Sequence, residues 1–125
     1  MQLSDLKLEH WPTSRLIPYA RNPRKNDHAV EQMASAIREF GFRLPIVAKS
    51  TGEICDGHLR YKAALRLGLE QVPVILADDL TETQLKAFRI LVNRSATWAD
   101  WDEDLLRLEL EELKLDDFDL ALTGF

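Results

Sequence analysis

The chain has 125 residues, of which 46% are hydrophobic and 30% are charged, as is usual for one compact soluble domain. No stretch of about 18 apolar residues is present and the first residues lack an apolar leader core, so we expect neither a membrane span nor a secretory signal. A single cysteine, Cys55, rules out an internal disulfide and favours a cytoplasmic protein with no membrane partner.

The net charge of −5 is distributed unevenly along the chain. Residues 100–125 contain ten acidic and two basic residues, whereas residues 1–99 contain eleven acidic and fourteen basic residues. A mildly basic body is suited to a nucleotide or nucleic acid. A solvated surface followed by an acidic helix explains the same pattern equally well.

Residues 1–25 give weak structural signals. Trp11-Pro12 is interpreted as a lead-in that covers a sheet edge, and residues 15–17 as a short strand that Pro18 ends. Residues 19–25 form a predicted loop, because Asn22-Pro23 is a turn signal. Its basic residues make the loop either a phosphate-binding segment or a solvated one.

Apolar spacing then predicts a helix over 28–40, capped by Asn26 or Asp27, with Met33 and Phe40 in the core. Residues 44–48 and 53–55 are predicted strands of a hairpin. A helix at 58–67 and a strand at 72–76 follow.

The rest of the chain is predicted to be helical. A capping box at Thr81 begins a helix with Leu85, Phe88 and Val92 on its buried face, and residues 93–98 break it. A last helix is predicted over 102–114, with acidic residues in its first turn. Trp98 and Trp101 have two alternative explanations: they pack this helix onto the body, or they stack on bases.

The joint between strand 53–55 and helix 58–67 is the strongest candidate for a site. Gly57 permits a sharp reversal, and His58 and Arg60 then lie in the first helical turn. A cation there opposes the helix dipole, and a bound phosphate would reverse that penalty and accept the free backbone N–H groups. A plain strand–helix joint with a solvated Arg60 is the alternative.

Two neighbours of this joint have competing interpretations. Asp56 either holds a metal ion beside the phosphate or caps the helix that follows. His58 is a phosphate donor, a general acid or base, or only a helix residue. Cys55 is interpreted as a small core residue.

Four motifs in register resemble the N-terminal domain of ParB and, more widely, the ParB/sulfiredoxin superfamily, over residues 14–98. They are Arg21-Asn22-Pro23-Arg24, the helix end at 36–41 with Leu44-Pro45-Ile46-Val47, the segment Gly57-His58-Leu59-Arg60, and Gly68-Leu69 before Val72-Pro73-Val74-Ile75. The resemblance implies an α/β (α+β) fold, a small mixed β-sheet flanked by helices. Residues 99–125 would then be an acidic helix and tail that could link to a missing domain.

The same resemblance implies a nucleotide, CTP or ATP, with Mg²⁺. Gly57, His58 and Arg60 would contact its phosphates, with Arg21, Asn22 and Arg24 nearby, and Asn93 and Arg94 would lie near the metal. Val92 stands where partition proteins have an acidic residue, which weakens the case for partition-type CTP hydrolysis. Sulfiredoxin chemistry would need a cysteine at position 58.

We expect no helix-turn-helix domain after Trp98, because too few residues remain for one, and the chain end resembles the junction before the catalytic domain of phage and prophage DNA methylases. We therefore expect a nucleotide-binding module of a DNA-associated protein, such as a DNA modification methylase or a partition-like factor. It would contact DNA weakly or through a fused or partner domain, and a homodimer stays open. A small-molecule kinase or nucleotidase, with weak hydrolysis or phosphotransfer, and an adaptor without turnover are the alternatives. No carboxylate or histidine cluster for a nuclease metal site is evident.

Overall fold

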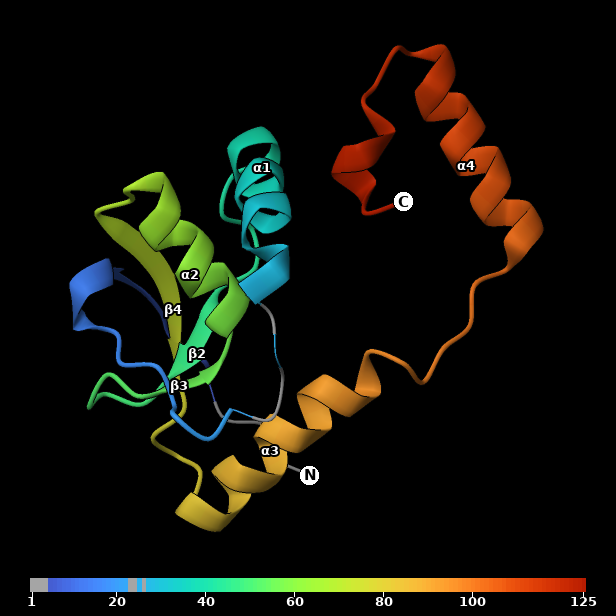
Figure 1. Ribbon diagram of the computed structural model, residues 1–125. Helices are drawn as coiled ribbons and strands as arrows, with labels where there is room; N and C mark the ends of the chain where they lie inside the picture. Colours follow the sequence, from blue (N-terminus) through green and yellow to red (C-terminus); the bar gives the residue numbers. More distant parts are fainter. Residues whose placement is uncertain (1–4, 23–24, 26) are drawn as a thin grey trace.

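The described residues of the computed structural model, 5–22, 25 and 27–125, contain one four-stranded mixed sheet (Figure 1). Its strands are β1 (Leu8–Pro12), β2 (Ile46–Ala48), β3 (Ile54–Asp56) and β4 (Gln71–Leu76), in the spatial order β1-β4-β2-β3. Strand β4 pairs antiparallel with β1 and parallel with β2, and β2 pairs antiparallel with β3. The predicted small mixed sheet flanked by helices is confirmed.

Four α-helices accompany the sheet in the described part of the chain: α1 (Val30–Phe40), α2 (His58–Leu67), α3 (Glu82–Ser95) and α4 (Glu103–Leu115). Short 3-10 segments occur at Thr13–Arg15 (η1), Asp27–Ala29 (η2) and Leu120–Thr123 (η3). Helices α1 and α2 lie side by side (Figure 1). Among the described residues, no helix has the length and apolar character needed to cross a bilayer.

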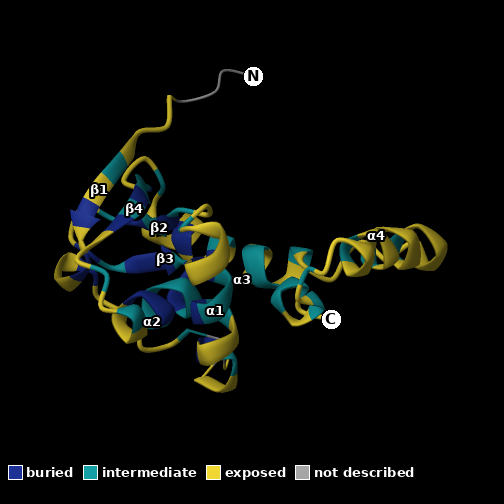
Figure 2. Ribbon diagram, turned by 90° about the horizontal axis from the view of Figure 1, so that it is seen from above, coloured by how far each residue is buried: buried dark blue, intermediate teal, exposed yellow. Residues whose placement is uncertain are grey.

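Alternation along β2 and β3 creates two apolar clusters on opposite faces of the sheet. Buried residues are concentrated in the strands and in α1 and α2 (Figure 2). Ile46, Ala48 and Ile54 pack with Ala64 of α2 and with Trp11 of β1. Val47 and Cys55 face the other way, toward Leu85 of α3, in a second cluster. The sheet is therefore covered by α2 on one face and by α3 on the other.

Several predicted elements differ from the observed ones near the N-terminus. The segment around Trp11 is a full edge strand, β1, in which Trp11 is 2% exposed. The strand predicted at 15–17 is wrong, because only Ile17 bridges to Glu53. The predicted cap of the first helix is not observed at Asp27, which lies in η2, and Asn26 lies outside the described residues.

The capping box is confirmed, because the Thr81 side chain accepts from the Gln84 N–H and Gln84 reciprocates. The predicted helix break at Asn93 is wrong, since α3 continues to Ser95. The Asn93 side chain donates to the Arg89 carbonyl oxygen at 2.8 Å, so its polar group bonds to the helix that contains it. Asn93 and Arg94 are therefore helical residues.

The C-terminal segment turns back toward α1 and does not pack α4 onto the sheet (Figure 1). Helix α4 has no buried residue, and Trp98 is exposed, so the expected packing of this helix onto the body is wrong. Trp101 meets Phe125 edge to face at 5.2 Å instead. Phe40, predicted as core, is 45% exposed and stacks on Phe118.

Candidate functional site

Gly57 joins β3 to α2 in a conformation that suits only glycine. Its φ is 106°, and a Cβ at this position would lie 3.1 Å from Cγ1 of Ile46. The N-cap residue of α2 is Gly57, which has no side chain, so this residue supplies no side-chain acceptor to the first backbone N–H groups of the helix. The predicted joint is thus present, with a tightly packed glycine at its turn.

The N-terminus of α2 opens into a cavity of about 470 Å³ between α2 and the start of α1. Its wall combines the turn residues 56–60 with residues that precede and begin α1. The lining residues are Lys25, His28, Ala29, Met33, Asp56, Gly57, His58, Leu59 and Arg60. Three of the predicted phosphate-binding residues therefore lie together, in a cavity that also contains Lys25 and His28.

Arg60 is held inside this cavity wall and is not a freely solvated side chain. Its Nη2 donates to the Pro45 carbonyl oxygen at 3.0 Å and to Oδ2 of Asp56 at 3.3 Å. Its Nε is buried and has no hydrogen-bond partner among the described residues. The guanidinium is thus fixed beside the helix N-terminus while one donor stays unsatisfied.

Asp56 lines the cavity but does not have the capping role that was one of its two interpretations. It does not cap α2, because Gly57 is the N-cap residue and no side-chain cap is formed. Its carboxylate pairs with Arg60 one turn further along the chain. Within the described ranges, no group of three or more His, Cys, Asp and Glu side chains is placed to hold a metal ion, so Asp56 lies in no such cluster.

His58 is buried at the start of α2 and accepts a hydrogen bond. Its Nε2 receives the backbone N–H of Tyr19 at 3.0 Å, which leaves the proton of a neutral imidazole on Nδ1. Burial lowers the pKa of His58 to about 4, and the positive charges of Arg89 and Lys62 act in the same direction. His58 is therefore neutral at physiological pH and ties the Tyr19 loop to α2.

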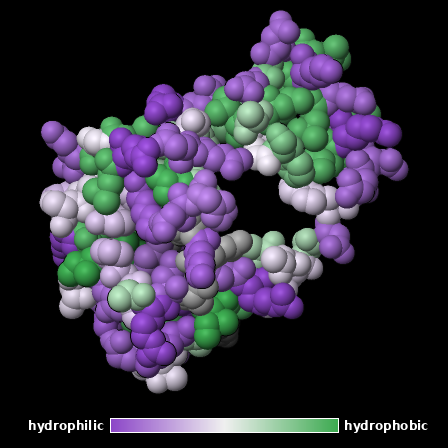
Figure 3. Space-filling model, in the orientation of Figure 1, coloured by the Kyte–Doolittle hydropathy of each residue, from purple (hydrophilic) through white to green (hydrophobic). Residues whose placement is uncertain are grey.

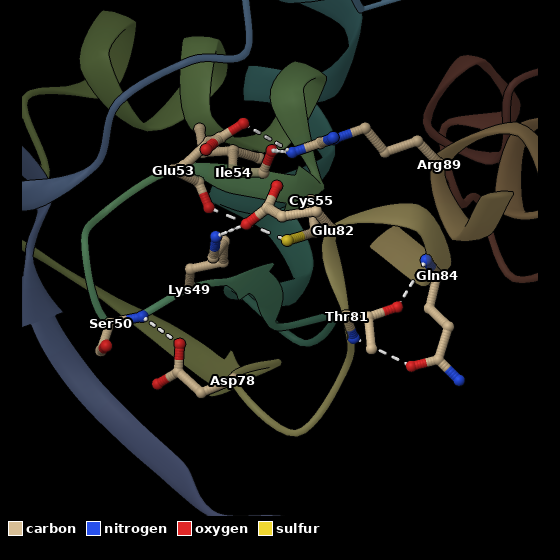
Figure 4. A network of polar contacts seen from close by, with 10 residues as sticks. All are labelled: Lys49, Ser50, Glu53, Ile54, Cys55, Asp78, Thr81, Glu82, Gln84 and Arg89. Carbon is tan, nitrogen blue, oxygen red and sulfur yellow. Dashed lines mark hydrogen bonds and ion pairs between the residues drawn. The ribbon is translucent and has the colours of Figure 1, made fainter. Parts of the chain in front are cut away.

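Arg89 is a buried cation that the sequence analysis missed (Figure 4). Its Nη2 donates to Oε1 of Glu53 at 2.8 Å, and its guanidinium carbon lies 3.7 Å from the centre of the Tyr19 ring. Its Nε, like that of Arg60, is buried without a partner among the described residues. The available signal was its position four residues after Leu85, on the predicted buried face of α3.

Four further predicted site residues that the structure describes do not line the cavity at α2, namely Arg21, Asn22, Asn93 and Arg94. Arg21 lines a separate cavity against α3, and the Asn22 N–H bonds to the Tyr19 carbonyl oxygen at 3.1 Å. Asn93 bonds within its own helix, and Arg94 contacts Thr97 on the exposed side. Arg24 lies outside the described residues.

Cys55 is 2% exposed in the cluster against Leu85, as the sequence analysis predicted. Burial raises the pKa of its thiol. The side chain is therefore a core group with little thiolate character.

The mixed sheet, the turn at Gly57 and the cationic first turn of α2 together define a class of domain. Similarity to known proteins shows which class this is. Residues 2–93 match the ParB N-terminal domain, so the chain belongs to this family.

Relatives of known sequence extend this assignment. The ParB-like nuclease domain-containing protein YnaK of Escherichia coli K12 is 39% identical over 80 residues, which cover 63% of this chain and 92% of the relative. The chromosome-partitioning protein Spo0J of Thermus thermophilus is 32% identical over 87 residues, 66% of this chain and 32% of that protein. A nucleoid occlusion protein of Bacillus cytotoxicus is 32% identical, with 30% of its length covered. The chain thus spans about a third of these two longer relatives.

Solved structures share the fold. The C-terminally truncated ParB of Caulobacter crescentus, complexed with CTP-γ-S, superposes with a TM-score of 0.75 at 24% identity, covering 94% of this chain and 71% of that one. Sulfiredoxin of Arabidopsis thaliana gives a TM-score of 0.52 at 22% identity, covering 66% and 96%.

Proposed function

We propose that this chain is a ParB-like nucleotide-binding module, for CTP or ATP, of a DNA-associated protein such as a DNA modification methylase or a partition-like factor. The observation that carries the proposal is the cavity of about 470 Å³ at the N-terminus of α2, where the buried Nε of Arg60 has no hydrogen-bond partner among the described residues. Contact with DNA would be weak or supplied by a fused or partner domain, and self-association would be as a homodimer.

The phosphates would lie against the first turn of α2. Backbone N–H groups that receive no cap from Gly57 and the positive end of the helix dipole favour an anion there. Arg60 would donate from Nε, and Lys25 and His28 would face the ligand from the opposite wall. The Caulobacter crescentus relative in complex with CTP-γ-S supports a nucleotide as the anion.

Magnesium fits this site only in part. Mg²⁺ is commonly held by one or two carboxylates together with the phosphates of its nucleotide. Asp56 is the carboxylate that lines the cavity, and it is shared with Arg60. The nucleotide would therefore supply most of the oxygen ligands, and Asp56 one.

A small-molecule kinase or nucleotidase is the second candidate function. The observation that favours this alternative is the carboxylate of Asp56 in the cavity. A kinase needs a carboxylate near the acceptor hydroxyl. Release of ADP or CDP on addition of a hydroxylated substrate would select this alternative. Nucleotide binding without any release of product would favour an adaptor role.

Calorimetric titration of CTP, ATP, ADP and GTP, with and without Mg²⁺, tests nucleotide binding. Arg60→Ala should weaken binding about tenfold or more, because charge-assisted hydrogen bonds contribute roughly 1.5–3 kcal/mol. Arg66→Ala is the matched control, since Arg66 lies on the same helix but outside the cavity and is exposed. Equal affinity of both variants, each shown to be folded by circular dichroism, would overturn the assignment of Arg60.

A further inference from the structure

A second cavity, of about 180 Å³, lies between the Tyr19 loop and α3. It is lined by Tyr19, Arg21, Lys86, Arg89 and Ile90, none of which lines the cavity at α2. Three of these five residues are cationic and none is acidic. Such a lining concentrates positive potential in a small volume.

Two separate segments bring these cations together. Lys86, Arg89 and Ile90 are three and four residues apart on α3, so they share one face of that helix. Arg21 reaches the same cavity from the loop. Arg21 and Lys86 are exposed, whereas Arg89 is 3% exposed, so two cations form the rim and one the base.

Arg89 has an unsatisfied donor at this base. Glu53 accepts from Nη2, and the Tyr19 ring covers the guanidinium at 3.7 Å, yet the buried Nε has no partner in the described structure. A buried donor without an acceptor costs roughly 1–3 kcal/mol. Nη2 also donates to the Ile54 carbonyl oxygen at 3.4 Å, so Nε is the donor that these contacts leave without an acceptor, and a bound acceptor would supply one.

We propose that the cavity between the Tyr19 loop and α3 is a phosphate-binding site, with Arg89 at its base and Arg21 and Lys86 at its rim. A phosphate group carries a charge of about −1.5 to −2 and three acceptor oxygens, which suits two cations and one further donor. The phosphate comes either as the free ion or as part of a mononucleotide. The site does not depend on a nucleotide at α2.

Arginine Nε–H resonances in a ¹⁵N-correlated NMR spectrum of the full chain test this proposal. The Nε–H groups of Arg60 and Arg89 are both buried and report on the two cavities separately. Arg89→Lys and Arg60→Lys assign the two signals by removing one each. Titration with inorganic phosphate should shift the Arg89 signal saturably, and titration with CTP shows whether a nucleotide reaches the same site.

Rim variants decide whether the response is specific. Lys86→Gln should weaken phosphate binding about two- to fivefold, and Arg21→Gln with Lys86→Gln about tenfold. The matched control is Arg107→Gln with Lys114→Gln, two cations of α4 away from this cavity. Loss in the rim variants alone supports the site.

Three results would overturn the proposal. They are an Arg89 signal that moves with neither phosphate nor CTP, equal weakening in the rim and control variants, and an Arg89 response that disappears in Arg60→Ala. The last result would show that the signal only reports binding at α2. Failure of CTP to move the Arg60 signal, with the Arg89 response intact, would instead count against the proposed nucleotide site.

Discussion

Arg60, which is half-buried, and Arg89, which is buried, use the same arrangement at different places in the fold. Arg60 and Arg89 each donate from Nη2 to a carboxylate, Asp56 or Glu53, and the buried Nε of each has no partner in the described part of the chain. Arg60 could be predicted, because Gly57 and the helical spacing mark its position beside a turn. Arg89 could not, because its partner is 36 residues away in the sequence and only the fold brings them together.

At the scale of a single side chain, His58 predicts a pH-dependent stability. Its pKa of about 4 lies below the ordinary 6.5, so between these values the unfolded chain binds more protons than the folded one. The free energy of unfolding should therefore fall as the pH falls from about 6.5 toward 4, by at most about 1.4 kcal/mol per pH unit from this group. Urea denaturation at several pH values measures it.

The control for His58 is another histidine in the same chain. His58→Gln should remove this contribution, whereas His28→Gln should preserve it, because His28 is exposed. An NMR titration that gives His58 an ordinary pKa, with an unchanged pH profile in His58→Gln, would contradict the assignment.

Among the elements, those with a clear apolar period were predictable and the edge strand was not. Strand β4 and helix α1 present a continuous apolar run or stripe, and both were located within a few residues. In β1 only Trp11 is buried, so no alternation could be read, and pairing with β4 alone makes it a strand. The sequence wrongly predicts that the helix ends at Asn93, because the hydrogen bond from the Asn93 side chain to the Arg89 carbonyl oxygen cannot be predicted from sequence.

The two ends of α2 predict different tolerance to alanine. Gly57→Ala should destabilise the fold by at least about 2 kcal/mol, because it combines a positive φ with contact at 3.1 Å to Ile46. Gly68→Ala has a positive φ but nothing within 4 Å, so about 1 kcal/mol is expected. Chemical denaturation measures both, and equal losses would show that packing at Gly57 contributes nothing.

Taken as a whole, the molecule separates a basic body from an acidic extension. Helix α4 and the segment after it contain most of the acidic excess, and their apolar side chains gather toward each other and not toward the sheet (Figure 3). Phe118 of this segment stacks on Phe40 of α1, with the ring centroids 6.1 Å apart. The charge asymmetry was evident from sequence, whereas this arrangement was not, because the leucines of α4 form no clean stripe.

This asymmetry predicts how the chain meets DNA. The cations of the body can neutralise a few phosphates, so binding to duplex DNA should be weak, independent of sequence, and strongly reduced between low and physiological salt. The acidic face of α4 opposes this binding.

Replacing Glu109, Glu111 and Glu112 by Gln changes the net charge from −5 to −2 and should strengthen DNA binding severalfold at low salt. The same three residues changed to Asp keep the charge and should leave affinity unaltered. Fluorescence anisotropy with two unrelated duplexes at two salt concentrations measures this, and tight, salt-resistant binding to one duplex would show a recognition element that charge does not explain.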